Sequence, residues 1–412
     1  MNLNLSFNRN MYVNRRRVLL RRIVHSSMTG GVLLLVCAVL AVMAANIPAL
    51  NWLHNFWDIS FGFSFGDSSF TMPVRQWVDD VLMAIFFFSV GLEIKRELLV
   101  GELSTMKKAM LPMFAALGGM IFPALIYTWF NTGTPSASGW GIPMATDIAF
   151  AIGVLSLLGN RCPQGLKVLL VALAVVDDIG AIIVLAVFYP SHEIHLIYLL
   201  YAALVLIVLV LMNRSGIRTL LLYMVLGIAL FIFIFMSGVH ATIAGVLLAM
   251  TIPAKTSTDD IRSFSGPDSP IGTLETALHP WVNFLIMPIF ALANAGVVID
   301  SSAIGEGVMP AVIPGVFFGL LVGKPVGIFI FSWLAVKLRL AGKPEGTKWL
   351  QIFALGILGG IGFTMSIFID NLAFTDPHLV NAGKLAILCT SVIAACIGLG
   401  ALYLTTNKTK NS

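Results

Sequence analysis

Twelve long apolar runs constrain this chain more than any other feature of its sequence. A helix needs about 20 apolar residues to cross the hydrocarbon core of a bilayer. The chain is 58% hydrophobic and only 11% charged, whereas a soluble domain carries about 25% charged residues. The sequence therefore predicts an all-α polytopic membrane protein with about 12 transmembrane helices. The runs cover approximately residues 28–48, 77–92, 109–130, 140–158, 166–189, 195–212, 218–236, 238–253, 281–298, 309–335, 349–371 and 382–405.

The positions of Lys and Arg predict how these spans are oriented. If the N-terminus is cytoplasmic, only Arg75 and Lys384 fall in outside loops and Lys324 falls within a span, while every other Lys and Arg lies inside. Short cytoplasmic loops carry an excess of basic residues in membrane proteins. We therefore expect both termini to be cytoplasmic. Because the basic residues are spread over short loops, the net charge of +5 does not indicate nucleic acid binding.

The segments outside the runs suggest a division of the chain. We expect a basic cytoplasmic arm at 1–27, a transmembrane domain at 28–405 and a cytoplasmic tail at 406–412. Between the first two spans, at about 57–75, the stretch FGFSFGDSSFTM alternates apolar residues with Gly, Ser and Asp. This alternation predicts a short external β-hairpin, with an irregular loop as the alternative. A polar stretch at about 254–279 is expected to form a cytoplasmic linker.

Two adjacent carboxylates, Asp177 and Asp178, lie in the middle of the run VALAVVDDIGAIIVLAVF. Placing one charged side chain at this depth costs at least about 2.5–3.5 kcal/mol, so such residues suggest a function by default. The alternative is a pair that is satisfied by a neighbouring helix or that lies at the membrane interface. Because apolar residues flank the pair on both sides, we expect protons or a cation to bind there. Neighbours on a helix point about 100° apart, so one carboxylate can face a cavity while the other faces a basic partner.

Two spans carry signals of a break. In GIPMATDIAFAIG, Pro143 removes a helix donor, and Thr146 and Asp147 supply side-chain oxygens that can cap a new helix start. In ALGILGGIGFTMSIFI, dense glycine precedes Thr364 and Ser366, which indicates either a second break or close helix packing. Two interrupted spans in corresponding positions of two halves indicate a transporter site near the midplane.

Other ionisable residues are candidates for supporting roles. Lys324, in GLLVGKPVGIFIF, lies in the interior of a span and needs a counter-charge, which the buried aspartates can supply; snorkelling to an interface is the alternative. His240, in SGVHATIAG, opens the eighth span and suits either a structural hydrogen bond or a pH-related role. Glu93, Glu97 and Glu275 lie at cytoplasmic helix ends, where each one individually resembles an interfacial charge paired with Lys95 or Arg96.

Six stretches of this sequence together resemble the NhaA-type sodium/proton antiporters. The resemblance covers the chain from about residue 28 to 405, and it implies inverted repeats formed by helices three to five and ten to twelve, with the discontinuous helices 4 and 11 crossing at the midplane. The longer basic arm and the sequence of the linker depart from the family pattern, which leaves the details of pH activation open. The stretches are ATDIAFAIGVLSLLG, ALAVVDDIGAIIVLAVFY, SGVHATIAGV, LETALHPWVNFLIMPIFALANAGV, VGKPVGI and GGIGFTMSIFI.

The resemblance also implies roles for individual residues. Asp178 and Asp177 would be the carboxylates that hold Na⁺, with Asp147 and Thr146 close by and Lys324 paired with Asp177. His240, Glu93, Glu97 and Glu275 match positions associated with pH regulation. The external hairpin matches the contact of a homodimer.

The expected function is secondary transport rather than enzyme chemistry. The resemblance implies electrogenic, pH-regulated exchange of cytoplasmic Na⁺ or Li⁺ for external protons, serving sodium and pH homeostasis in a bacterial inner membrane, with membrane lipid around the protein and without a cofactor. Hard cations prefer oxygen ligands, which carboxylates and hydroxyls provide. A sodium-coupled symporter of an organic solute is the alternative on a similar fold. An intramembrane aspartyl protease is more remote because its GxGD motif is absent.

Overall fold

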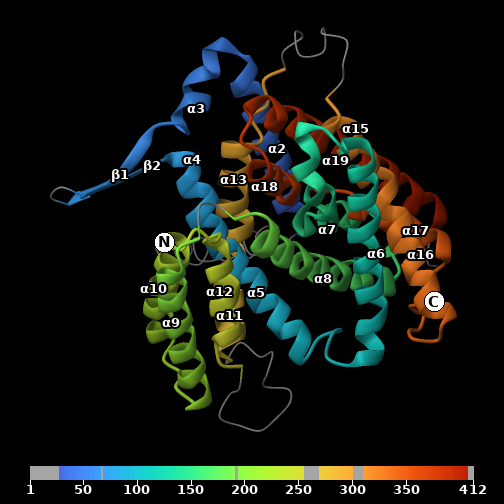
Figure 1. Ribbon diagram of the computed structural model, residues 1–412. Helices are drawn as coiled ribbons and strands as arrows, with labels where there is room; N and C mark the ends of the chain where they lie inside the picture. The colour runs from blue at the N-terminus through green and yellow to red at the C-terminus, as the bar shows by residue number, and fades with distance from the viewer. Residues whose placement is uncertain (1–26, 66–67, 191–193, 255–268, 300–309, 407–412) are drawn as a thin grey trace, which may run out of the picture.

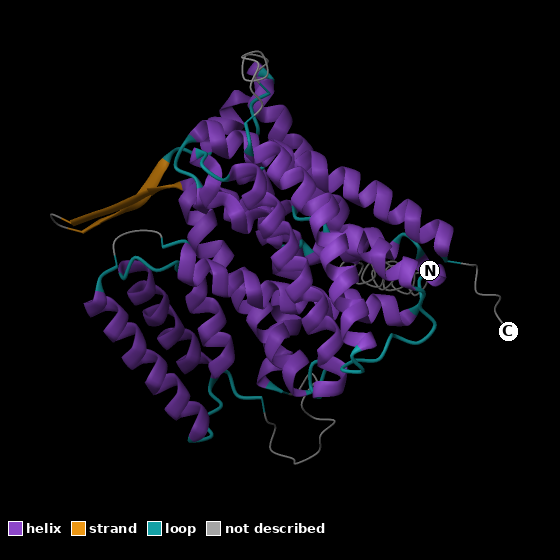
Figure 2. Ribbon diagram, turned by 45° about the vertical axis from the view of Figure 1, so that its right-hand side comes forward, coloured by secondary structure: helices purple, strands orange, loops and turns teal. Residues whose placement is uncertain are grey.

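The computed structural model describes residues 27–65, 68–190, 194–254, 269–299 and 310–406. It shows a bundle of helices from which a two-stranded sheet projects to one side (Figures 1 and 2). The predicted N-terminal arm, apart from residue 27, and the predicted tail, apart from residue 406, lie outside the described residues. Many large apolar side chains face outward, such as Trp129, Leu196 and Leu404, which are 85%, 76% and 82% exposed. A lipid-facing surface of this kind is expected of a membrane protein.

The described elements follow one another as helices with a single hairpin near the beginning. They are α2 (Ser27–Asn46), η1 (Pro48–Leu50), α3 (Asn51–Phe56), β1 (Ser60–Phe65), β2 (Ser68–Pro73), α4 (Val74–Trp77), η2 (Val78–Leu82), α5 (Met83–Leu99), α6 (Met106–Asn131), η3 (Pro135–Met144), α7 (Ile148–Ser156), η4 (Gly159–Arg161), α8 (Gln164–Phe188), α9 (Leu196–Arg214), α10 (Leu220–Met236), α11 (Thr242–Thr251), α12 (Pro270–Trp281), η6 (Val282–Ile286), α13 (Met287–Asn294), α15 (Val312–Phe318), η7 (Gly319–Gly323), α16 (Lys324–Lys337), α17 (Trp349–Gly359), α18 (Phe363–Ala373) and α19 (Pro377–Thr405).

Each of the twelve predicted apolar runs is helical. Among the described residues, seven helices are long and apolar enough to cross a membrane, and nine spans result when each of two bent pairs counts as one. The shorter apolar helices α10 and α11 cover two further runs, and the end of α4, η2 and α5 together cover the run predicted at 77–92. The all-helical polytopic fold is confirmed. Three of the predicted runs, those of α5, α10 and α11, thus correspond to helices that are shorter than the seven spanning ones.

The predicted hairpin is present between the first two long helices. β1 and β2 pair antiparallel, with Phe61 opposite Met72 and Gly62 opposite Thr71. The Trp77 indole donates a hydrogen bond of 2.9 Å to the Phe61 carbonyl, which fixes the base of the hairpin against α4. We call the end of the bundle where the hairpin is attached the hairpin side. The end where α11 stops and α12 begins is called the linker side.

The ninth span begins earlier than its apolar run indicates. The prediction placed a linker at 254–279, but α12 is already helical from Pro270. Ser269 caps this start, because its hydroxyl accepts a 3.0 Å hydrogen bond from the Gly272 N–H, and proline is favoured at the first helical position. The predicted end of the linker at about 279 was therefore wrong, since the residues from Pro270 onward belong to α12. The first turns of α12 are polar, so they were not recognised as part of a span.

Two bent helix pairs cross each other in the interior. η3 and α7 meet at 45°, and α17 and α18 meet at 48°. At the crossing, the Asp147 N–H donates a 2.7 Å hydrogen bond to the Ile361 carbonyl, so the two breaks satisfy each other's backbone. At the second break a side chain on Gly360 would collide with the Leu320 carbonyl. Both predicted breaks are confirmed; the inverted relation between the two halves stays a prediction.

The flanking helices of the two broken pairs pack closely. α6 and α16 approach at Gly118 and Gly327, where a Cβ on either residue would overlap the backbone carbonyl of the other. Small residues allow such backbone approach in membrane helices, where packing rather than the hydrophobic effect holds helices together. A separate apolar cluster joins α5, α9, α10 and α11. The crossing site thus lies in the larger cluster, with a smaller helical layer beside it (Figure 1).

Candidate functional site: buried carboxylates at the helix crossing

Asp177 forms a buried ion pair with Lys324. Its Oδ2 lies 2.7 Å from the Lys324 Nζ, and both side chains are almost completely buried, at 2% and 1% exposed. The same oxygen lies 2.6 Å from the Thr146 hydroxyl, which is also 2.9 Å from the Gly359 carbonyl. A hydroxyl has one proton, so Thr146 donates to only one of these acceptors at a time. The pairing of Lys324 with Asp177 that the resemblance implies is present.

An irregular stretch of the tenth span positions Lys324. The π-helical turn η7 (Gly319–Gly323) ends directly before it, and Pro325 follows it without a backbone donor. The Lys324 ammonium also donates to the Met144 carbonyl, at the end of η3. A cation beside the last carbonyls of a helical segment offsets their partial negative charge. Lys324 therefore connects α8 to the first broken pair, because it forms an ion pair with Asp177 of α8 and donates a hydrogen bond to the Met144 carbonyl of η3.

Asp147 is fully engaged at the crossing. Its Oδ1 accepts from the Phe150 N–H at 2.9 Å and so caps α7, as the sequence predicts. Its Oδ2 accepts from the Thr364 hydroxyl at 2.5 Å and from the Thr364 N–H at 3.3 Å. These bonds connect the first turn of α7 to the first turn of α18. Two positive helix ends therefore point at one buried carboxylate, which stabilises its negative charge.

Asp178 combines a buried oxygen that has no hydrogen-bond partner with access to a cavity, whereas Asp177 keeps such an oxygen, Oδ1, away from that cavity. Asp178 is 2% exposed, and its Oδ1 accepts no hydrogen bond from the described residues. It lines a cavity of about 250 Å³, together with Thr146 and Asp147, whereas Asp177 and Lys324 do not. The two adjacent aspartates therefore face different surroundings, as the helical period predicts. Asp178 is the carboxylate with both space and coordinating capacity for a proton or a cation.

The same cavity extends from Asp178 toward the linker side. Glu93, Arg96, Glu275 and His279 also line it. Arg96 lies 3.1 Å from Glu97 and 3.1 Å from Glu275, so it bridges two carboxylates from α5 and α12. A cation that enters along this path therefore passes acidic side chains before it reaches the buried aspartates.

The predicted residues do not all come together. Glu93 and Glu275 share the cavity with Asp178, and Glu97 borders it through Arg96. His240 is 4% exposed and precedes α11, and it is not among the residues that line this cavity. Within the described chain no group of three or more His, Cys, Asp and Glu side chains could hold a metal ion. A sodium ion at Asp178 would therefore need hydroxyl or backbone oxygens as well.

Sequence reasoning missed several buried polar residues. Thr364 was noted only for its span, yet it is the main partner of Asp147. Lys384 was assigned to an outside loop but is 6% exposed within α19, and Asp370 is completely buried in α18. Asp370 lies at the end of a predicted apolar run, so the rule that singled out Asp177 could have found it.

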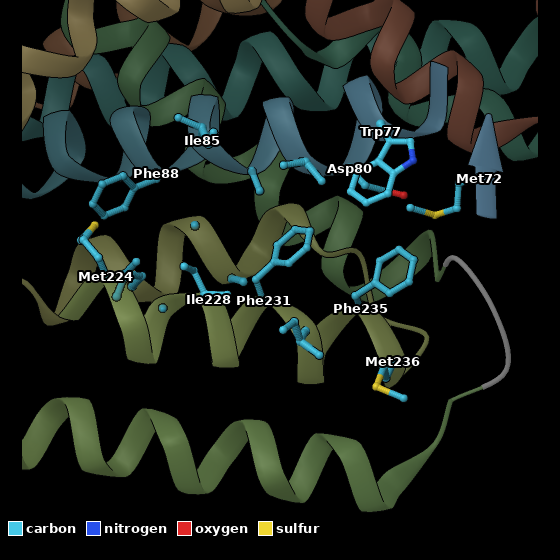
Figure 3. A pocket seen from close by; sticks show the side chains of 17 residues that line it. Met72, Trp77, Asp80, Ile85, Phe88, Met224, Ile228, Phe231, Phe235 and Met236 are labelled. Atoms are coloured by element: carbon cyan, nitrogen blue, oxygen red, sulfur yellow. The ribbon is translucent and has the colours of Figure 1, made fainter. Parts of the chain in front are cut away.

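An apolar groove lies apart from these carboxylates, between α5 and α10. Its volume is about 690 Å³, and Figure 3 shows Phe88, Ile228 and Phe231 directed into it. Asp80, near its end, is its one charged lining residue in the described part of the chain. A groove of this composition suits apolar groups and offers few oxygen ligands for a hard cation.

Comparison with known proteins shows which family the chain resembles. The family model described as Na+/H+ antiporter 1 matches residues 21–402. The Na(+)/H(+) antiporter NhaA 2 of Aliarcobacter butzleri is 48% identical over 392 residues, which cover 95% of this chain and 98% of that protein. The Na(+)/H(+) antiporter NhaA of Wolinella succinogenes is 45% identical over 93% of this chain and 92% of its own. The Na(+)/H(+) antiporter NhaA of Escherichia coli (strain UTI89) is 47% identical over 92% of this chain and 96% of its own.

Proposed function

The chain belongs to the Na+/H+ antiporter 1 family, and we propose that it exchanges one cytoplasmic Na⁺ for external protons at Asp178. One observation carries this assignment of the site: Asp177 and Asp178 each keep a buried oxygen without a hydrogen-bond partner among the described residues, but of the two Asp178 is the one that lines the cavity. Asp177 is held by Lys324, and Asp147 is held by the first turns of α7 and α18. Li⁺, which is also a hard cation, is expected to use the same oxygens.

Competition for one carboxylate couples the two ions. Burial and a neighbouring like charge both favour the protonated form of a carboxylic acid. A proton and a sodium ion each neutralise Asp178, but they cannot both occupy it. The loaded or protonated site can therefore move across the membrane, whereas an unneutralised pair of buried carboxylates is too costly to move. No separate gate is needed to prevent sodium from leaking.

Alternating access follows from the crossing of two broken helices. The two breaks are joined by hydrogen bonds of Thr146 and Asp147 to the Gly359 and Ile361 carbonyls and to Thr364. Helix breaks absorb backbone changes more easily than continuous helices do. We propose that the two half-helices on each side of the crossing move together and expose Asp178 to one side at a time.

The exchange is proposed to be electrogenic. If two protons enter for each sodium that leaves, one net charge moves inward, and a potential of about 100 mV supplies roughly 2.3 kcal/mol per cycle. Because about 1.36 kcal/mol corresponds to a factor of ten, this term alone can sustain a sodium gradient of roughly 50-fold. Sodium export against its gradient is thus possible without a second energy source.

The alternatives fit the site less well. A symporter of an organic solute needs a pocket of about 300–1,000 Å³, but the cavity at Asp178 is about 250 Å³ and leads past acidic side chains. An aspartyl protease needs two carboxylates that share a proton across a substrate. Here Asp177 and Asp178 are neighbours on one helix, and Asp177 is bound to Lys324.

The orientation and assembly are also proposals. We place the hairpin side outside and the linker side in the cytoplasm of a bacterial inner membrane, since basic residues concentrate toward the linker side. Both termini would then be cytoplasmic. The hairpin β1–β2 projects from the bundle with unpaired edges (Figure 2), and an exposed strand edge is a template for pairing. We propose that it joins two copies in a homodimer.

The function can be tested in everted membrane vesicles that hold an acidic interior. Adding Na⁺ or Li⁺ should dissipate the pH gradient, because each ion displaces protons from Asp178, whereas K⁺ should have a much smaller effect because it fits the small oxygen site poorly. Vesicles without the protein give the baseline. A gradient that collapses equally with K⁺, or that requires an organic solute, would contradict sodium/proton exchange.

Glu275→Gln should move the pH profile of exchange toward lower pH and leave the maximal rate nearly unchanged. The substitution removes one negative charge from the cavity and frees Arg96 to act on the remaining carboxylates, so these lose their protons more readily. Exchange rates across a pH series measure the shift. Glu102→Gln is the matched control, because Glu102 is exposed and 3.8 Å from Lys108. If the Glu275 profile coincides with that control, Glu275 is an ordinary interfacial charge.

A further inference from the structure

Asp370 is a buried carboxylate that the proposed transport mechanism does not use. It is 0% exposed, and neither of its oxygens accepts a hydrogen bond from the described residues. It follows Thr364, the partner of Asp147, by six residues of α18, which corresponds to about 9 Å of helix rise. A carboxylate buried without any donor is strongly destabilising in its ionised form. Something must neutralise Asp370.

Two other charged groups lie around Asp370 at the hairpin side. Lys384 of α19, only 6% exposed, interacts electrostatically with both Asp370 and Asp79. The Asp370 carboxylate packs directly over Gly383, where a Cβ would overlap it. Asp79 accepts a 2.6 Å hydrogen bond from Asn294, which in turn accepts a 2.8 Å bond from Asn371. These hydrogen bonds therefore connect Asn371, the residue next to Asp370, to Asp79 at the start of the second span.

The remaining titratable groups near this cluster come from four other elements. Arg75 lies 3.3 Å from the exposed Asp58, and its charge acts on Lys384 and Asp79. Burial, and next the charge of Arg75, lower the pKa of His54 on α3, which favours the neutral form of this imidazole. The Tyr127 hydroxyl of α6 donates to the Ser136 carbonyl and is uncharged. η3 and α13, which also pack on α18, contain no titratable side chain.

The charges of this cluster do not balance by themselves. The carboxylates of Asp58, Asp79 and Asp370 face the two cations Arg75 and Lys384, and Asp80 adds a further carboxylate that acts on Asp79, so negative charge is in excess. A metal cation is a poor choice to compensate this excess, because the charge of the Lys384 ammonium already acts on Asp370 and no group of three acidic, His or Cys side chains in the described chain could hold one. A proton on Asp370 reduces this excess and needs no further ligand.

We propose that Asp370 is a second proton-exchange site, placed between the hairpin-side surface and the transport site. One proton adds to an Asp370 oxygen from water at the hairpin side, and the same O–H bond breaks when the proton continues toward Asp147 and Asp178. Lys384 balances the carboxylate after the proton has left. This inference rests on the proposed function, since it assigns the hairpin side to the external water from which protons enter.

Infrared difference spectroscopy tests whether Asp370 takes up a proton. The purified full-length protein in lipid is titrated, and the carbonyl stretch of protonated carboxylic acids is followed. Asp370→Asn should remove one titrating carboxylic acid that the matched control Asp376→Asn retains, because Asp376 is an exposed cap of α19 at the same side. An unchanged set of titrating acids in Asp370→Asn overturns the proposal.

A sided transport measurement tests the position of the site. Proteoliposomes with an independent pH on each side should show exchange by Asp370→Asn that is roughly 100-fold slower, as expected for loss of a proton-transfer group. The rate should depend much less on pH at the hairpin side, while Na⁺ binding and the pH dependence at the linker side remain. The double variant Asp370→Asn with Lys384→Gln removes both charges, so it supplies the same measurement if the single variant is unstable.

The outcomes separate this inference from the proposed function. Wild-type dependence on hairpin-side pH in both variants would overturn the role of Asp370 while leaving sodium/proton exchange at Asp178 intact. Exchange that survives in Asp178→Asn would instead show that Asp178 is not the transport site. The infrared titration would still report whether Asp370 takes up a proton.

Discussion

Asp178→Asn should abolish sodium-driven proton movement in proteoliposomes while the protein still inserts into the membrane. Asparagine has nearly the same shape as aspartate, but it carries no charge that a sodium ion can neutralise and it does not exchange a proton at this position. The affected oxygen has no hydrogen-bond partner among the described residues, so the change breaks no contact of the native fold. Removing a buried unpaired charge should even raise thermal stability.

Three measurements make this prediction decisive. Na⁺-dependent proton flux reports the function, Na⁺ binding to the purified protein reports the site, and thermal unfolding reports the fold. Asp376→Asn, an exposed change of the same kind, should match the wild type in all three. Flux near the wild-type rate in Asp178→Asn would show that the sodium ion does not bind at this carboxylate.

The main features of the fold could be predicted because the membrane restricts the possible structures. Every backbone group at bilayer depth must be satisfied within the protein, so long apolar runs become helices and departures from this pattern stand out. Pro143 followed by Thr146 and Asp147 predicted a helix start that Asp147 does cap. The glycines around Gly360 left packing and a break as equal alternatives. The structure shows both, since the break occurs where Gly360 meets a backbone carbonyl.

The division between Asp177 and Asp178 was predictable only in part. The helical period requires that adjacent carboxylates face different directions. It does not say which of them meets Lys324, because that residue lies 147 positions along the chain from Asp177. The resemblance supplied the assignment, and the ion pair in the structure agrees with it.

The hairpin-side cluster shows what the sequence could not reveal. Lys384 was placed in an outside loop, at the edge of the run predicted at 382–405, but α19 already begins at Pro377 and buries it. Asp79 and Asp370 come from distant spans, and hydrogen bonds through Asn294 connect Asp79 to Asn371, the residue next to Asp370. Contacts between elements that are far apart in sequence follow from tertiary packing, which a single sequence does not encode in any local pattern.

Lys324 distinguishes two accounts of how charge moves through the site. Its ammonium donates hydrogen bonds to Asp177 and to the Met144 carbonyl, and the side chain is shielded from solvent, at 1% exposed. In one account it only offsets the buried charge of Asp177. In the other it also carries a transported proton, which it releases when sodium enters. The two accounts predict the same structure but different charge movement in variants.

Lys324→Gln should lower the free energy of unfolding strongly, because breaking a buried pair from one side costs about 3–5 kcal/mol. Lys324→Arg should keep the charge and most of the stability. Thermal unfolding measures both, and Lys337→Gln, on the last turn of α16 beside Trp333, is the matched control. If Lys324→Gln is as stable as wild type, the ion pair does not hold the crossing together.

The reversal potential of Lys324→Arg in proteoliposomes then decides between the two accounts. Arginine does not lose its proton in a protein, so an arginine at this position can balance Asp177 but cannot carry a transported proton. We expect Lys324→Arg to retain electrogenic exchange with an unchanged charge per sodium, because the unpartnered oxygen that accepts the ion belongs to Asp178 and lies in the cavity that Lys324 does not line. A reversal potential that changes to that of one proton per sodium would show that the proton of Lys324 is transported. In that case the buried pair, rather than Asp178 alone, would couple the two ions.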